Sequence, residues 1–231
     1  MSLIKSISGI RGTIGGKTGD NLTPVDVVKF TVAFASIILK KETLNKKVVV
    51  GRDARPSGPM VNDLVIATLV GMGIDVIDLG LSTTPTVEIA VPLENAAGGI
   101  ILTASHNPVQ WNALKLLNEK GEFISGEDGQ HLLEIAESEN FSFADVKHLG
   151  KVTKDDTYLQ KHIDQILALS SVDVELIKKA GFKIAVDAVN SSGGIAVPML
   201  LKALGVTEIK EINCEPNGHF AHNPEPLPEN L

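Results

Sequence analysis

A strand–helix–strand pattern near the start of the chain constrains the fold more than any other feature. Residues 47–53 form an apolar, β-branched run that ends in Asp53 and leads into a turn rich in proline and glycine. Residues 60–72 then have the composition of a helix, Gly73 ends it, and a second apolar run covers 74–79. Parallel sheets are built from this unit, in which a helix connects two buried strands. The first part of the chain is therefore predicted to be an α/β domain.

The same order of elements returns near the end of the chain. A predicted strand at 183–188 is followed by a Ser-Gly turn, a helix at 195–204 and a strand at 206–212. The repetition predicts two domains of related topology, with the boundary in a polar stretch between them. We expect a three-layer α/β/α domain with a mixed, mostly parallel sheet over 1–150, and a partial second domain of similar topology over 151–231.

The second predicted domain looks incomplete. It offers only two sheet strands and a proline-rich tail, and a two-stranded sheet is marginally stable by itself. We therefore expect the chain to be the N-terminal portion of a longer protein, cut inside its second domain.

The composition narrows the possible partners and the compartment. The 231 residues are 43% hydrophobic, and 21 basic against 28 acidic side chains give a formal net charge of −7. This balance argues against nucleic acid or an anionic membrane as the main partner, although a few cations in a cleft suffice for a small anionic substrate. Cys214 is the single cysteine, the start of the chain lacks a secretory pattern, and no apolar run reaches membrane-spanning length. We expect a cytoplasmic location.

The segment 103–108, TASHNP, follows the apolar run 99–102 and carries the most specific chemistry. It delivers Ser105 and His106 to the carboxyl end of a predicted buried strand, where open α/β sheets bind their ligands. The lipase-type elbow requires Gly-x-Ser-x-Gly, which is absent here, so a serine-hydrolase interpretation is disfavoured.

A phosphoserine fits this position of Ser105 better. We expect Asn107 to cap a helix and Pro108 to occupy its first position, so that the N–H groups of that helix would hold a phosphate. The spacing alone is equally compatible with a turn that only begins a helix.

Basic residues elsewhere suit contact with a phosphoryl group. Lys115 could neutralise charge or carry a proton if its pKa is lowered, and Arg11 lies between Gly9 and Gly12 with room for a bidentate phosphate contact. For the segment 51–58, GRDARPSG, we expect only a local role in which Asp53 caps a turn and the arginines pair nearby. A loop at 12–18 resembles a P-loop but has arginine where the first glycine is required, so nucleotide binding is disfavoured.

Together these segments resemble one enzyme family. In family order they are 8–12 (SGIRG), 51–58 (GRDARPSG), 80–85 (GLSTTP), 103–108 (TASHNP) with Asn112 and Lys115, 186–190 (VDAVN), 216–218 (PNG) and 223–228 (NPEPLP). The chain resembles the N-terminal portion of the α-D-phosphohexomutases, which include phosphomannomutase/phosphoglucomutase and phosphoglucosamine mutase. One departure is Asn112-Ala113 where the family usually has Asn-Gly, which indicates a different local turn.

The resemblance implies a mechanism and a set of site residues. Ser105 would be the phosphoserine that exchanges a phosphoryl group with a hexose phosphate through a bisphosphorylated sugar, and glucose 1,6-bisphosphate or a similar compound would activate it. Lys115 and Arg11 would assist proton transfer and charge neutralisation, and His106 would help to arrange the substrate hydroxyl. Mg²⁺ would bind the phosphate on Ser105, while its aspartate ligands and the remaining C-terminal domains would lie beyond the end of this chain.

Two alternatives to a phosphomannomutase/phosphoglucomutase stay open. The protein could be a phosphoglucosamine mutase, because the sequence does not choose among the sugars. It could also be a non-catalytic sugar-phosphate-binding module, although the joint presence of Ser105, Lys115 and Arg11 weighs against that interpretation. In either case the 231-residue chain alone is expected to have negligible turnover.

Overall fold

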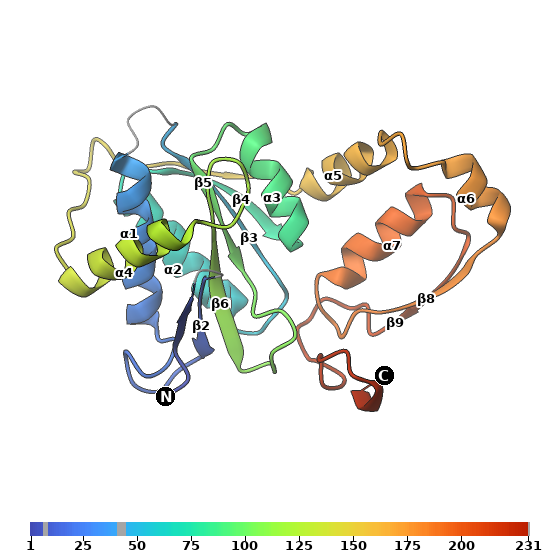
Figure 1. Cartoon of the computed structure of the whole chain (residues 1–231), viewed down its shortest axis with the longest axis horizontal. Helices are drawn as coiled ribbons and strands as arrows, with labels where there is room; N and C mark the ends of the chain where they lie inside the picture. Colours follow the sequence, from blue (N-terminus) through green and yellow to red (C-terminus); the bar gives the residue numbers. More distant parts are fainter. Residues whose placement is uncertain (7–8, 41–44, 231) are drawn as a thin grey trace.

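A computed structural model describes residues 1–6, 9–40 and 45–230 of the chain. Its first domain contains the elements β1 (Ile4–Ser6), β2 (Gly9–Thr13), α1 (Pro24–Lys40), β3 (Lys47–Arg52), α2 (Gly58–Gly71), β4 (Asp75–Leu81), α3 (Thr84–Leu93), β5 (Gly98–Leu102), β6 (Trp111–Leu117), α4 (Gly126–Ser138) and β7 (Val152–Lys154). The chain continues through α5 (Tyr158–Leu167), α6 (Val174–Ala180), β8 (Lys183–Asp187), α7 (Gly193–Ala203), β9 (Glu208–Ile212) and the short 3₁₀ helix η1 (Pro228–Asn230) (Figure 1).

The first sheet has seven strands in the order β1-β2-β6-β5-β3-β4-β7. The strands β2, β3, β4, β5 and β7 run in one direction, while β1 and β6 run in the other. This is the mixed, mostly parallel sheet that the sequence predicts. The predicted domain boundary after residue 150 stays a prediction, and the strand that follows it, β7, pairs with β4 of the first sheet.

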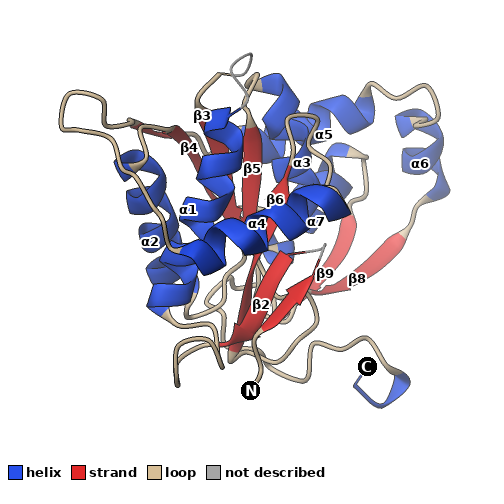
Figure 2. Ribbon diagram, turned by 60° about the vertical axis from the view of Figure 1, so that its left-hand side comes forward, coloured by secondary structure: helices blue, strands red, loops and turns tan. Residues whose placement is uncertain are grey.

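Helices cover both faces of this sheet because its buried strands are apolar on both sides (Figure 2). Val48 and Val50 of β3 belong to a core that includes residues of α1, α2 and α4. Val49, which points to the opposite face, belongs to a second core with residues of α3 and with Tyr158 at the start of α5. The three-layer α/β/α arrangement is thus confirmed.

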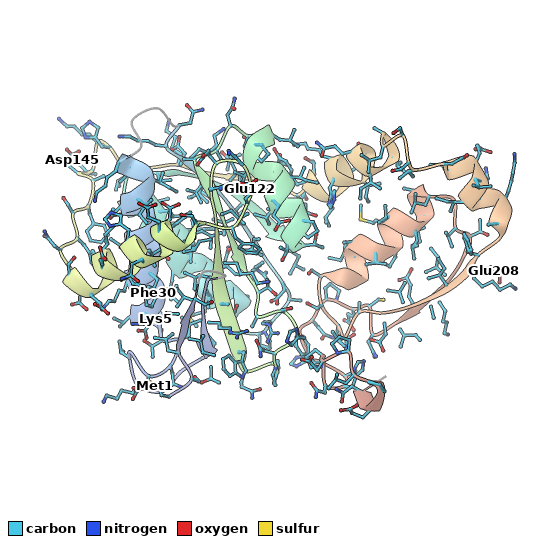
Figure 3. The ribbon with its side chains drawn as sticks, in the orientation of Figure 1. Met1, Lys5, Phe30, Glu122, Asp145 and Glu208 are labelled. Atoms are coloured by element: carbon cyan, nitrogen blue, oxygen red, sulfur yellow. The ribbon has the colours of Figure 1, made fainter. Side chains whose placement is uncertain are left out.

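At the edge of the first sheet, the long side chain of a lysine covers part of the apolar core. Lys5 on the edge strand β1 places its ammonium group 5.7 Å from the centre of the Phe30 ring on α1 (Figure 3). Phe30 itself is buried in the core that also includes Ile10 of β2. The aliphatic stem of a lysine can cover such a ring while its charge stays in water.

The second domain repeats the strand–helix–strand unit. Strands β8 and β9 pair in parallel, and α7 connects them. Helix α5 bridges the two domains by contacting both α3 and α7 (Figure 1). Two parallel strands with one crossover helix are the partial domain of similar topology that the repeat predicts.

The order of the strands locates the ligand-binding edge. From β3 the chain passes through α2 to β4 on one side of β3, then returns through α3 to β5 on its other side. The strand order therefore reverses between β3 and β5, and ligands of open α/β sheets bind in the crevice at such a reversal. Among the described residues, no helix combines the length and apolar character needed to cross a membrane.

Candidate active site

Two loops meet at the reversal of strand order. One follows β3 and contains Asp53 and Arg55, and the other, residues 103–110, follows β5 and contains Ser105. The backbone N–H of Asp53 donates to the carbonyl of Leu102 at 3.0 Å, which extends the pairing of β3 and β5 into the loops. The predicted reactive serine thus lies at the edge where this fold binds ligands.

A cavity of about 290 Å³ at this edge brings the predicted site residues together. Arg11, Ser105, His106 and Lys115 all line it. Arg11 comes from β2, Ser105 and His106 come from the loop that follows β5, and Lys115 comes from β6. These three strands are neighbours in the sheet, although β2 is distant from β5 and β6 in the sequence. Their convergence agrees with the sequence prediction, while the chemical role of each residue stays a prediction.

The sheet register explains why the two cations face the same space. Arg11 on β2 pairs with Ala113 on β6, and Lys115 follows Ala113 by two residues. Side chains two residues apart on a strand share a face, and so do directly paired residues on adjacent strands. Gly9 allows the close approach of β2 here, since a β-carbon on it would lie 2.2 Å from the carbonyl oxygen of Leu114.

The surroundings of Lys115 lower the pKa of its amine. Burial lowers the pKa of its amine from the usual 10.5, Arg11 lowers it further, and the carboxylates of Glu88 and Asp53 partly oppose the change. Burial also raises the pKa of Glu88, an effect that Lys115 opposes. Glu88 lies on α3, which covers this face of the sheet. The sequence motifs do not identify Glu88, because the 80–85 motif ends three residues before it.

Ser105 adopts a left-handed backbone conformation with φ of +54°. Its N–H donates to Thr103 Oγ1 at 3.2 Å, and its Oγ lies 3.4 Å from Nδ1 of His106. The other ring nitrogen of His106 lies 3.3 Å from a carboxylate oxygen of Glu225 in the C-terminal tail. A non-glycine residue with this backbone conformation is strained, and such strain gathers at functional positions.

The predicted helix after Ser105 is absent, and this prediction was wrong. Residues 105–106 and 109–110 form turns, 107 is a bend, and the chain leads directly into β6, which is antiparallel to β5. The expected cap also fails, since the side-chain oxygen of Asn107 is buried without a hydrogen-bond partner in the described structure. The physical reason is that Arg55 binds the main-chain carbonyls of Ser105, Asn107 and Pro108, which a helix would need for its own hydrogen bonds.

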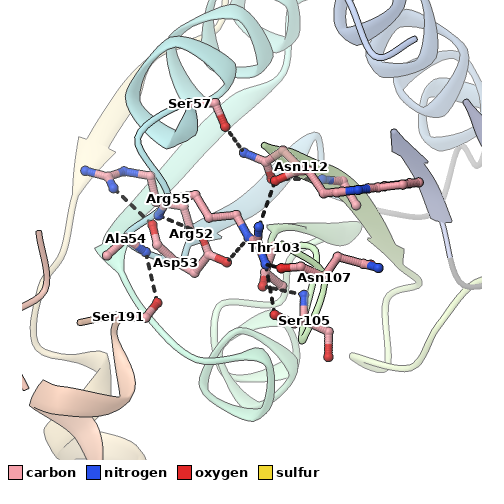
Figure 4. A network of polar contacts seen from close by, with 12 residues as sticks. Arg52, Asp53, Ala54, Arg55, Ser57, Thr103, Ser105, Asn107, Asn112 and Ser191 are labelled. Atoms are coloured by element: carbon pink, nitrogen blue, oxygen red, sulfur yellow. Dashed lines mark hydrogen bonds and ion pairs between the residues drawn. The ribbon is translucent and has the colours of Figure 1, made fainter. Parts of the chain in front are cut away.

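The expectation of a purely local role for the 51–58 segment was half right. Asp53 does cap a turn, because its carboxylate accepts from the N–H of Arg55 at 3.0 Å, and it also pairs with the Arg55 side chain. The remaining donors of Arg55, however, reach across to the serine loop (Figure 4). Sequence reasoning missed this contact because its acceptors are backbone carbonyls, which leave no signature in the choice of side chains.

Asn112 and Ala113 lie inside strand β6, so the turn expected there does not exist. Neither residue has a positive φ, and the alanine is therefore unstrained. Asn112 is fully buried, its amide nitrogen donates to Ser57 Oγ at 2.9 Å, and its oxygen accepts from the N–H of Ala113 at 2.8 Å. It links strand β6 to Ser57, the residue that precedes α2 (Figure 4).

Residues of the second domain contact the loop that follows β3. Ser191 Oγ accepts a hydrogen bond from the N–H of Ala54 at 3.4 Å, and the ring of Phe220 lies 5.1 Å from the guanidinium carbon of Arg55. A second cavity of about 190 Å³ is lined by residues of both domains, including Ser105. The sequence motif of the tail, 223–228, gives no sign of the contacts that Glu225 and Phe220 make with the first domain.

The residues present do not by themselves fit a magnesium ion. Within the described ranges there is no group of three or more histidine, cysteine, aspartate or glutamate side chains that could hold a metal. The cavity at Ser105 instead presents the two cations Arg11 and Lys115. The expected role of Mg²⁺ would need oxygen ligands from a phosphate and from other parts of the protein, so we derive no step of the chemistry through it.

Both domains match known protein families. "Phosphoglucomutase/phosphomannomutase, alpha/beta/alpha domain I" matches residues 3–143, and the corresponding domain II matches 160–231. A Phosphoglucomutase/phosphomannomutase of Thermococcus kodakarensis is 39% identical over 95% of this chain and 48% of its own length. A Phosphoglucosamine/phosphogalactosamine mutase of Sulfurisphaera tokodaii is 32% identical over 100% of this chain and 49% of its own length.

Solved structures give the same result. A Phosphoglucomutase/phosphomannomutase family protein from Burkholderia thailandensis superimposes with a TM-score of 0.75 at 27% identity, over 95% of this chain and 47% of that one. A protein from Thermus thermophilus gives a TM-score of 0.85 at 26% identity, over 100% of this chain and 50% of that one. The chain spans about half the length of the curated relatives it matches. The chain therefore belongs to the phosphoglucomutase/phosphomannomutase family and matches its α/β/α domains I and II.

Proposed function

We propose that the protein carrying this chain is a phosphohexomutase that interconverts hexose 1-phosphates and hexose 6-phosphates through a phosphorylated Ser105. The observation that carries the proposal is the convergence of Ser105, Lys115 and Arg11 on one cavity at the carboxyl edge of the sheet. The family relationship supports it, because related chains are named as mutases of hexose phosphates.

The proposed chemistry is a phosphoryl exchange between Ser105 and the sugar. A hydroxyl oxygen of the sugar monophosphate bonds to the phosphorus on Ser105, and the bond between that phosphorus and Ser105 Oγ breaks. The proton of the hydroxyl passes to the neutral amine of Lys115 and then to the released Oγ. The bisphosphorylated sugar turns in the site and returns its other phosphate to Ser105 by the reverse steps.

The surroundings of Ser105 support these roles. The lowered pKa of Lys115 increases the fraction of neutral amine that can accept a proton. The guanidinium of Arg11 lines the cavity beside Ser105 and suits a pair of phosphate oxygens. His106 lies 3.4 Å from Ser105 Oγ, where it can orient the hydroxyl that attacks or leaves.

Mg²⁺, a hexose phosphate substrate and an activating sugar bisphosphate complete this proposal. When bound, the metal would offset the charge of the phosphoryl group. Because the family relatives are about twice as long as this chain, we propose that the metal ligands, the sugar-reading surfaces and the other domains come from the rest of the protein. On this account the 231-residue chain is inactive alone, and the protein works in the cytoplasm without nucleic-acid or membrane partners.

A phosphoglucosamine mutase is the second candidate, and the names of several related proteins favour it. The two candidates differ only in the sugar, so one assay distinguishes them. Phosphorus NMR would follow the conversion of glucose, mannose and glucosamine 1-phosphates by the complete gene product, with Mg²⁺ and a trace of the matching bisphosphate. We expect turnover of at least one sugar and its loss in Ser105→Ala.

Two results would contradict the proposal. Interconversion that persists in Ser105→Ala would remove the serine from the mechanism. An absence of turnover with every sugar, together with tight binding of a sugar phosphate, would instead favour a non-catalytic binding module.

A further inference from the structure

The side chain of Arg55 lies fully buried beneath the serine loop, with every N–H of its guanidinium group used. Its Nε donates to Asp53 Oδ2 at 3.0 Å. The two terminal nitrogens donate to four main-chain carbonyls of the serine loop (103–110) and the first residue of β6: Pro108 at 2.6 Å, Trp111 at 2.9 Å, Ser105 at 2.9 Å and Asn107 at 2.7 Å. A guanidinium has five N–H groups, and these contacts account for all five. Figure 4 shows Arg55 between Asp53 and the loop that contains Ser105 and Asn107.

Burying the charge of the Arg55 guanidinium costs desolvation free energy, so the presence of an arginine at this position needs a physical explanation. Asp53 is the one carboxylate that pairs with Arg55 in the described structure. Three of the other four acceptors belong to the loop 103–110, and the fourth is the carbonyl of Trp111, the first residue of β6. An apolar side chain of similar volume would fill the same space without the desolvation cost. It could not, however, hold four carbonyl groups at fixed positions.

The contacts also fix which way the peptide groups of the loop face. In a trans peptide the C=O and the following N–H point in opposite directions, and the described structure has no cis peptide bonds. Because the carbonyl of Ser105 points to Arg55, the N–H of His106 points away from it. This N–H has no hydrogen-bond partner among the described residues, and His106 lines the cavity that also contains Ser105.

We propose that Arg55 is the positioning residue of the reactive serine. Its guanidinium draws the loop carbonyls inward, holds Ser105 in its left-handed conformation, and leaves the N–H of His106 free to donate to a phosphoryl group on Ser105 Oγ. The inference rests on the proposed function, in which Ser105 carries the phosphoryl group. Arg55 touches neither the phosphate nor the sugar and acts through the shape of the loop.

The neighbouring arginine provides a matched control. Arg52 has one hydrogen bond from its side chain, to the carbonyl of Asp53 at 3.1 Å, and makes none to the serine loop. We would compare Arg55→Met, Arg55→Lys and Arg52→Met in the complete gene product. Lysine keeps the charge but offers three donors in place of five, so it separates the effect of charge from that of the planar fork and guards against a methionine variant that fails to fold.

The first measurement is amide hydrogen exchange of the peptide that covers 103–111. In Arg55→Met we expect exchange there to rise about tenfold or more, with the peptides of α1 and β4 unchanged, because the loop opens without global unfolding. Exchange of this peptide in Arg55→Lys should be intermediate between that of Arg55→Met and that of the unmodified protein. In Arg52→Met it should equal that of the unmodified protein. Exchange at 103–111 that does not change in Arg55→Met would overturn the proposal.

The second measurement separates positioning from general stability. Single-turnover transfer from glucose 1,6-bisphosphate to Ser105 should slow about 100-fold in Arg55→Met, while the dissociation constant for the bisphosphate stays within about threefold. Arg55→Lys should recover part of the rate, and Arg52→Met should keep all of it. A normal transfer rate in Arg55→Met would overturn the inference and leave the proposed function intact. If the unmodified protein takes up no phosphate on Ser105, the proposed function fails, and with it the phosphate-directed part of this inference.

Discussion

Arg11 and Lys115 extend from neighbouring antiparallel strands into one cavity, because Arg11 pairs with Ala113 and Lys115 lies two residues further along β6. Two cations held on one face repel each other, and Arg11 accordingly contributes to the lowered pKa of Lys115. A phosphate between them would relieve this repulsion. The arrangement therefore favours an anionic ligand even though the chain as a whole is acidic.

The pKa of Lys115 is the most direct electrostatic prediction. NMR titration of the lysine side chains should show Lys115 losing its proton at lower pH than the ordinary value for a lysine, because its amine is partly buried. Glu88→Gln should lower this pKa further, since the Glu88 carboxylate opposes the effect of burial. A rise in the Lys115 pKa on Glu88→Gln would contradict the electrostatic description of the site.

The same pKa change has a consequence for stability. The folded state releases the Lys115 proton at lower pH than the unfolded chain does, so the unfolded chain binds more protons between the two pKa values. This contribution makes the free energy of unfolding rise with pH across that window. Denaturant titrations of the unmodified protein and Lys115→Met would isolate it, and the rise should be weaker in the variant.

Removing the Lys115 amine tests its role in proton transfer. Lys115→Met should slow phosphoryl transfer to Ser105 by about 10² to 10⁴, the range typical of a lost acid–base group. Lys120→Met is the control, since Lys120 is exposed and lies outside the residues that line the cavity. Equal rates in the two variants, measured by single-turnover quench, would show that Lys115 has no part in the transfer.

The left-handed conformation of Ser105 predicts an unusual ranking of stability. Glycine adopts a φ of +54° without the clash that alanine suffers, so Ser105→Gly should be more stable than Ser105→Ala by about 1 kcal/mol. The control site is Ser142, which is exposed and lacks a positive φ, and where glycine should give no advantage. Thermal denaturation of the four variants decides the point, and a more stable Ser105→Ala would contradict the conformation described here.

Gly121 should be far less tolerant of substitution than Gly129. At Gly121 the φ is +78°, and a β-carbon would lie 2.0 Å from the carbonyl oxygen of Glu88, so Gly121→Ala should cost about 3 kcal/mol. Gly129 lies within α4 with open space around it, and Gly129→Ala should stabilise the protein by about 0.5–1 kcal/mol. Urea denaturation of both variants would measure the contrast, and similar effects would argue against the close contact between Gly121 and α3.

Much of the fold follows from local sequence patterns. The β-branched run that becomes β3 and the apolar run before Ser105 that becomes β5 are both buried strands, as predicted. The grouping of Arg11, Ser105, His106 and Lys115 also agrees with the prediction, because the family motifs identify them individually and the sheet order brings them together.

The errors arise where distant backbone groups decide the local structure. The sequence Asn107-Pro108 is typical of a helix start, but the contacts from Arg55 compete for the carbonyls that a helix would use. Asn112-Ala113 suggests a turn, yet pairing with β2 makes it a strand. Glu88 becomes visible as a partner of Lys115 only once α3 is placed over this face of the sheet.

Phosphate uptake on Ser105 is the step on which every proposed role in the site depends. It is tested most directly by incubating the complete gene product with glucose 1,6-bisphosphate, digesting it, and locating phosphate by mass spectrometry of the peptides. The proposed mechanism predicts phosphate on Ser105, and none in the same peptide of Ser105→Ala. Phosphate found on another residue, or uptake that persists in Ser105→Ala, would contradict it.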